Sequence, residues 1–237
     1  MQQQIADGKS IRETVPVPPQ LRRRLWYAII SSGLFIIVVS IEGAQRPDYD
    51  AWQQSISALS LGSRGWIQIF NFIAFGAIVL STVTAWRKIL SGGIGAKAFP
   101  ILTAFTGMSL IICGIIPQDP APGYDPQHLT LKAPTLNGLI HLLFAGIGAL
   151  SSAVSLMIMA RRFTGDPSWY GWSAYSVLAA IAMTACVAVY AIWSTASTGY
   201  AGMFERLALI VTPVWGLVFL IRLERGRPFM QIEKLKG

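Results

Sequence analysis

The residues able to do chemistry in this 237-residue chain gather at the ends of its apolar segments. Asn137 and His141 stand four residues apart, a spacing that puts both side chains on one face of a helix. Glu205 and Arg206 open the last apolar segment, and Glu42 closes the first. An imidazole beside a carboxylate can exchange protons, and a guanidinium offers a planar set of donors suited to phosphate or carboxylate. The set therefore suggests anion binding or acid–base catalysis.

Two further polar residues belong to the same set. Asn71 lies about a turn and a half into the second apolar segment, and Asp119 lies in a proline-rich loop before His141. Catalysis would require His141 to reach a carboxylate, either Asp119 or Glu205, by a hydrogen bond. A network that only ties helix ends together is the alternative, because polar groups near the membrane surface are less costly than at its centre. The candidate ligand-binding residues are Arg206, Glu205, His141, Asn137, Asn71, Glu42 and Asp119.

The apolar segments that position these residues indicate a membrane protein. Hydrophobic residues make up 53% of the chain and charged residues only 13%, and the mean hydropathy is +0.52. Apolar blocks of about 20 residues are long enough to cross a hydrocarbon core of about 30 Å as helices. We therefore predict an all-α polytopic membrane bundle of six transmembrane helices. Its spans are expected near 25–44, 66–86, 98–117, 137–160, 172–193 and 203–223.

This bundle takes up nearly the whole chain. Residues 1–24 are polar, rich in proline and basic at their end, so we expect a flexible cytoplasmic tail. The transmembrane domain is predicted over residues 25–225, and a short cytoplasmic tail over residues 226–237. Such a division leaves no room for a soluble catalytic domain.

The distribution of basic residues predicts the orientation. Fifteen of the 19 Lys and Arg residues fall on the side of the termini, and four fall on the other side. Because basic residues are enriched in cytoplasmic segments, both termini are predicted to be cytoplasmic, in a bacterial plasma membrane. The net charge of +8 comes from these helix-end residues and does not indicate nucleic-acid binding.

The sequence lacks the residue patterns that several cofactors require. No lysine lies within a predicted span for a retinal Schiff base, and the two histidines do not form the axial pair of a membrane haem. No ligand spacing indicates a metal site. The loop at residues 92–98 is rich in glycine but lacks the Gly-Lys-Ser/Thr order of a phosphate-binding loop. We expect it to be a flexible connector, and we expect no cofactor and no metal.

The loop motifs resemble a bacterial membrane family called domain of unknown function 998. The likeness spans roughly residues 25–225 and implies a six-helix membrane bundle without an established activity. It is carried by Ser57-Ala58-Leu59-Ser60, Gly65-Trp66-Ile67-Gln68, Asn71-Phe72, Gly114-Ile115-Ile116-Pro117-Gln118-Asp119-Pro120, Gly123-Tyr124, Gly138, His141, Arg161-Arg162-Phe163, Gly171-Trp172, Tyr175-Ser176 and Glu205-Arg206.

These observations lead to one functional expectation and two alternatives. We expect a non-enzymatic membrane protein whose outer-face polar pocket binds a lipid head group or a small polar molecule. The first alternative is an accessory or scaffolding subunit of a larger membrane protein complex. The second is a membrane enzyme that uses His141 with a carboxylate. The expected partners are membrane lipids and, in the first alternative, that larger complex; nucleic acid is not among them.

Overall fold

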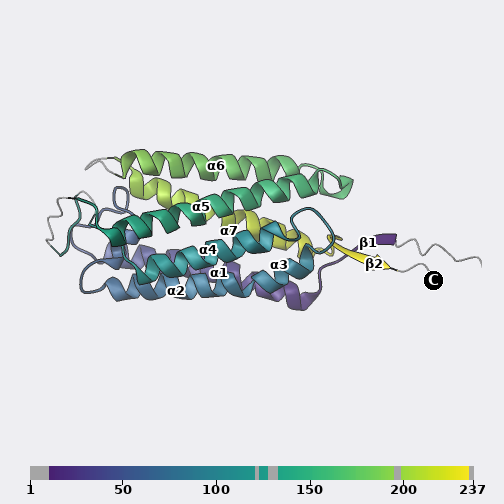
Figure 1. Cartoon of the computed structure of the whole chain (residues 1–237), viewed down its shortest axis with the longest axis horizontal. Helices are drawn as coiled ribbons and strands as arrows, with labels where there is room; N and C mark the ends of the chain where they lie inside the picture. The colour runs from purple at the N-terminus through teal and green to yellow at the C-terminus, as the bar shows by residue number, and fades with distance from the viewer. Residues whose placement is uncertain (1–10, 121–122, 128–132, 195–198, 235–237) are drawn as a thin grey trace, which may run out of the picture.

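The computed structural model describes residues 11–120, 123–127, 133–194 and 199–234, and long helices dominate it (Figure 1). A short antiparallel ribbon joins β1 to β2 and projects from one end of the bundle along its long axis. The elements, in chain order, are β1 (Ile11–Val15), α1 (Pro19–Ala44), the 3₁₀ helix η1 (Ile56–Ser60), α2 (Gly65–Ser81), α3 (Val83–Ile89), α4 (Ala98–Ile115), α5 (Leu136–Phe163), the 3₁₀ helix η2 (Pro167–Trp169), α6 (Trp172–Trp193), α7 (Ala201–Glu224) and β2 (Met230–Lys234).

Six helices in the described part of the chain are long and apolar enough to cross a membrane, with α2 and α3 together forming one of them. Large hydrophobic side chains remain exposed along these helices, as a hydrocarbon surrounding requires. The predicted class, an all-α bundle of six transmembrane helices, is confirmed. The chain is a multi-pass membrane protein.

The first helix begins earlier than the sequence predicted. It starts at Pro19 instead of residue 25, because proline at the first helical position already has a helical φ angle. The basic cluster therefore lies within α1. Arg22 donates to the carbonyl oxygen of Leu223 and lies 3.2 Å from the carboxylate of Glu224, which ties the start of α1 to the end of α7.

Each long helix packs against its neighbours in the chain, and α7 returns to α1, so the six spans close into a ring. The tightest packing joins α2 to α4. A Cβ added to Gly76 would lie 2.6 Å from the carbonyl oxygen of Gly107, so the two backbones meet where neither residue has a side chain. Close approach at small residues is a main source of packing energy in lipid.

The two ends of the bundle are closed in different ways. The end that carries β1 and β2, here called the tail end, holds an aromatic core around Phe163, Trp169, Trp215, Phe219 and Phe229. The other end, here called the loop end, carries residues 45–64, 116–120, 123–127 and 133–135, and the first of these segments fills it. The seven candidate residues of the sequence analysis all belong to the half of the bundle nearer the loop end.

Orientation can be tested with single cysteines in a variant whose Cys113 and Cys186 are replaced by alanine. Ser63 is exposed at the loop end and Ser91 is exposed at the tail end. In intact cells a membrane-impermeant thiol reagent should label Ser63→Cys, and it should label Ser91→Cys only after the membrane is opened, because the basic tail end is expected in the cytoplasm. The reverse pattern would overturn the predicted orientation.

Candidate functional site

The loop after α1 folds back into the bundle and carries much of the candidate site. Ile56, Ala58 and Leu59 of η1 are 0% exposed and pack among α1, α2 and α7. The side chain of Ser55 caps η1 by accepting a hydrogen bond from the backbone N–H of Ala58. Residues 54–61 of this loop are therefore a buried part of the core, whereas residues 51–53 before them are exposed.

Arg206 of α7 holds this loop in place. Its Nη1 donates to the carbonyl oxygens of Ala51 at 2.8 Å, Gly202 at 2.9 Å and Gln54 at 3.2 Å. Its Nη2 donates to the hydroxyl of Tyr49 at 2.6 Å. Both terminal nitrogens of the guanidinium are thus engaged within the chain, in a geometry that joins the loop to α7.

Glu205 precedes Arg206 but makes a different contact. Its carboxylate accepts a hydrogen bond from the backbone N–H of Ile56 at 2.5 Å, at the start of η1. Tyr190 of α6 and Cys113 of α4 lie within electrostatic reach of it. Consecutive residues on a helix point about 100° apart, so the two neighbours contact different residues of the same loop.

Tyr49 links these contacts through its hydroxyl. The hydroxyl donates to the carbonyl oxygen of Ser55 at 3.0 Å and accepts from Arg206. Burial raises the pKa of Tyr49 to about 12, so the phenol stays protonated and keeps this donor at neutral pH. Its ring meets the ring of Tyr124 edge to face, with centroids 5.3 Å apart.

Glu42 lies at the centre of a separate ion cluster at the same end. It is only 4% exposed, and its carboxylate lies 2.5 Å from Arg64 and 3.4 Å from Arg46. Arg46 also donates to the carbonyl oxygen of Leu61 at 2.7 Å. The hydrogen bond to Glu42 raises the pKa of Arg64 above its ordinary value. Two arginines thus share one buried carboxylate, which leaves the cluster with a formal charge of +1.

Arg46 and Arg64 are site residues that the sequence analysis missed, since it used them only to count charges. The i,i+4 spacing of Glu42 and Arg46 was the available signal, because such a pair faces the same side of a helix. Arg64 could not be found in this way, since it follows a loop whose path the sequence did not reveal.

A pocket of about 470 Å³ opens beside this cluster. Its wall contains two arginines and two aspartates, so it presents both signs of charge. Its lining residues are Gln45, Arg46, Pro47, Asp48, Leu61, Gly62, Ser63, Arg64, Gly123, Tyr124, Asp125 and Pro126.

None of the seven predicted site residues lines this pocket, although Glu42 holds the two arginines that do. Asp119 accepts hydrogen bonds from the backbone N–H of Thr135 at 2.8 Å and from its hydroxyl at 2.5 Å, at the start of α5. The Nδ1 of His141 lies 2.7 Å from the carbonyl oxygen of Ile116, whereas its Nε2 is buried without a partner among the described residues. Asn137 is exposed.

Asn71 is buried against α1. Its amide donates to the carbonyl oxygen of Phe35 at 3.1 Å and to the side chain of Gln68 at 3.2 Å. The structure thus places the seven predicted residues at one half of the bundle but in several separate networks. Among the described residues, no three His, Cys, Asp or Glu side chains lie close enough together to hold a metal ion.

Fold and site together define a six-helix multi-pass membrane protein with a charged pocket at one end of the bundle. The chain matches, over residues 29–222, the family described as protein of unknown function (DUF998). This match covers most of the chain, and the chain belongs to that family. No curated protein and no solved structure matches it.

Proposed function

We propose that the protein binds a zwitterionic phospholipid head group in the loop-end pocket, without catalysing a reaction. The observation that carries this proposal is the buried Glu42 that fixes Arg46 and Arg64 at a cavity also lined by Asp48 and Asp125. Arginine suits a phosphate, and a carboxylate suits an amine. A head group that carries both, such as phosphoethanolamine, matches both signs of charge on the pocket wall.

The position of Arg64 supports phosphate binding. Its side chain is 47% exposed, and it reaches Glu42 through Nε and Nη2. None of the hydrogen bonds found among the described residues uses its Nη1. Because Glu42 holds the guanidinium in a fixed orientation, an incoming phosphate would meet a donor that needs little further ordering.

The position of the pocket relative to the membrane surface supports a lipid as the source of this head group. Ala44 ends α1 and Gly65 begins α2, so the pocket lies at the ends of two membrane-crossing helices, where lipid head groups lie. Trp52, in the loop after α1, and Trp66, in the first turn of α2, are 60% and 66% exposed. Exposed tryptophan is typical of the boundary between hydrocarbon and water.

The contacts of His141 favour binding over catalysis. Its Nδ1 lies beside a backbone carbonyl oxygen and not beside a carboxylate. Its Nε2 could act as a base only on a substrate that reaches it, but His141 is 4% exposed and does not line the loop-end pocket.

The test compares Arg64→Gln with Arg227→Gln, a matched change at an exposed residue of the tail end. The chain is extracted in mild detergent, and native mass spectrometry measures the phosphatidylethanolamine that stays bound. We expect Arg64→Gln to reduce its occupancy about tenfold, because a charge-assisted hydrogen bond is lost, and Arg227→Gln to leave it unchanged.

A parallel arm adds soluble phosphoethanolamine to the delipidated chain in detergent. Stabilisation by the soluble compound, without retention of the lipid, would assign the pocket to a free ligand. Equal lipid retention by Arg64→Gln and Arg227→Gln would overturn the pocket as a head-group site.

A further inference from the structure

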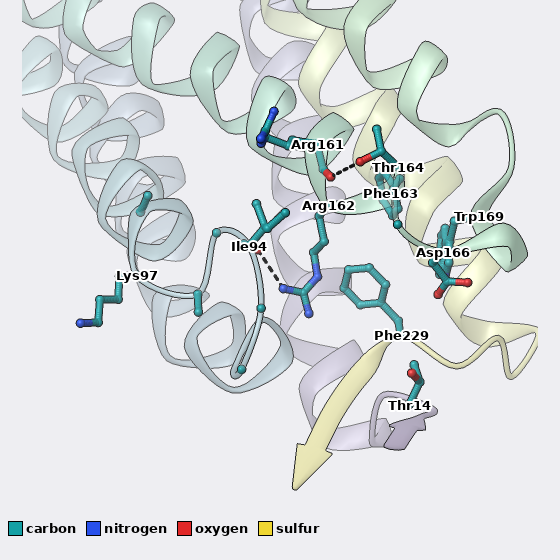
Figure 2. Close-up of a pocket in the computed structure, with 16 residues that line it drawn as sticks. Thr14, Ile94, Lys97, Arg161, Arg162, Phe163, Thr164, Asp166, Trp169 and Phe229 are labelled. Atoms are coloured by element: carbon teal, nitrogen blue, oxygen red, sulfur yellow. Dashed lines mark hydrogen bonds between the residues drawn. The ribbon is translucent and has the colours of Figure 1, made fainter. Parts of the chain in front are cut away.

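A second cavity, of about 870 Å³, lies at the tail end of the bundle. Figure 2 shows the loop at residues 92–98 on one side of it, the end of α5 above it, and Phe229, the residue before β2, opposite the loop. From this cavity we infer that the protein has a second ligand site, which holds the phosphate of an anionic phospholipid. This site shares no residue with the loop-end pocket.

The loop at residues 92–98 is anchored to α5. Gly92 and Gly95 have φ angles of 75° and 84°, a left-handed conformation that other residues adopt only with strain. Arg162 donates through Nη1 to the carbonyl oxygens of Ile94 at 2.8 Å and Leu90 at 3.3 Å. These contacts hold the glycine-rich segment as a wall of the cavity, whereas the sequence suggested only a flexible connector.

Arg162 supplies the donor that points to an anion. Its guanidinium lies over the ring of Phe229, 5.0 Å from the centroid, in the space between the loop and β2 (Figure 2). Its Nη2 is buried and has no hydrogen-bond partner among the described residues. A buried charged donor without an acceptor is unfavourable, and a phosphate oxygen in the cavity that Arg162 lines would satisfy it once the guanidinium turns toward that cavity.

The charges of the lining favour an anion as well. The lining contains three basic residues, Lys97, Arg161 and Arg162, and one acid, Asp166, which gives a formal sum of +2. The side chains of Lys97 and Arg161 point away from the cavity (Figure 2), so they raise the potential at its rim and do not fill it. A phosphate would therefore enter a positively charged region and meet Arg162 inside it.

The position of this cavity relative to the membrane surface favours a lipid as the source of the phosphate. Ala98 begins α4 and Phe163 ends α5, so the cavity lies where two membrane-crossing helices end. The tail end also carries most of the basic residues of the chain, and such clusters attract anionic lipids of the adjacent leaflet. The occupant is thus a phospholipid with a net negative charge, for which phosphatidylglycerol is a suitable probe.

Gly165 provides a test that leaves the fold intact. It lines the cavity, and a Cβ added to it meets no atom within 4 Å. Gly165→Asp and Gly165→Asn have the same shape and differ only in charge. In phosphatidylcholine nanodiscs with and without phosphatidylglycerol, we expect the anionic lipid to raise the Tm of the wild type and of Gly165→Asn. In Gly165→Asp its apparent affinity should fall about tenfold, because the added carboxylate repels the phosphate.

A second pair of variants tests the donor itself. Arg162→Gln should abolish the rise in Tm that phosphatidylglycerol causes, whereas Arg23→Gln, the same change at an exposed residue of this end, should preserve it. Because Arg162 also anchors a loop, the Gly165 pair decides the matter if Arg162→Gln does not fold. Equal effects of phosphatidylglycerol on Gly165→Asp and Gly165→Asn would overturn the site. A full effect of inorganic phosphate in phosphatidylcholine discs would overturn the lipid as its occupant.

Discussion

Replacing Arg206 with methionine is expected to lower the free energy of unfolding by about 2–4 kcal/mol, because several part-buried acceptors would be left without their donor. The arginine donates to three backbone carbonyl oxygens and to the hydroxyl of Tyr49. Methionine has a similar length but no donor, so these acceptors would lose their partner. Lysine should recover only part of the loss, because its single ammonium cannot match the planar fork of a guanidinium.

Two measurements check this expectation. Thermal unfolding in detergent should show a lower Tm for Arg206→Met and an unchanged Tm for Arg227→Met, a matched change at an exposed arginine. A cysteine at Ser57, which is buried in η1, should react with a thiol reagent only when the loop leaves the bundle. Loss of co-purified anionic lipid with no change in Tm would show instead that Arg206 anchors a ligand.

The sequence was informative about which residues matter and less so about how they are connected. It predicted that Glu42, Glu205 and Arg206 gather near one membrane surface, and all three lie in the loop-end half of the bundle. It suggested a shared network, but Glu42 pairs with Arg46 and Arg64, whereas Arg206 binds the loop backbone. The spacing to Glu42 could have indicated Arg46, but Arg64 and the loop backbone are reached through a folded loop, so hydropathy and spacing could not identify them.

Features of the fold that depend on local sequence could be predicted, whereas contacts between distant segments could not. The spans follow from apolar length, and their predicted positions agree closely with the helices. The pairing of Ile11–Val15 with Met230–Lys234 joins segments at opposite ends of the chain, and no pattern within either segment indicates the other. The contact of Gly76 with Gly107 is likewise visible only once α2 and α4 are packed.

Gly202→Ala is expected to destabilise the protein by about 3 kcal/mol, although alanine is the better helix former. Gly202 lies in the first turn of α7, where its N–H donates to the carbonyl oxygen of Gln53 at 3.1 Å. A Cβ at this position would collide with the carbonyl oxygen of Gln54 and lie 2.6 Å from that of Ala51. Backbone atoms cannot move aside as a flexible side chain can, so the loop would have to shift.

Gly146 of α5 provides the matched control. A Cβ added there meets no atom within 4 Å, so Gly146→Ala should stabilise the protein by about 0.5–1 kcal/mol through helix propensity alone. The two substitutions are chemically identical and should shift the Tm in opposite directions. If Gly202→Ala instead proved as stable as Gly146→Ala, the loop would not lie against α7 as described.

The double variant Gly202→Ala/Arg206→Met gives a sharper version of this test. Both changes act on the contact between α7 and residues 51–54, one by steric collision and one by loss of hydrogen bonds. Once either change has displaced the loop, the other has less left to disrupt. The combined loss of stability should therefore be clearly smaller than the sum of the single losses, as expected for residues that share partners. Strict additivity would mean that Gly202 and Arg206 stabilise different parts of the protein.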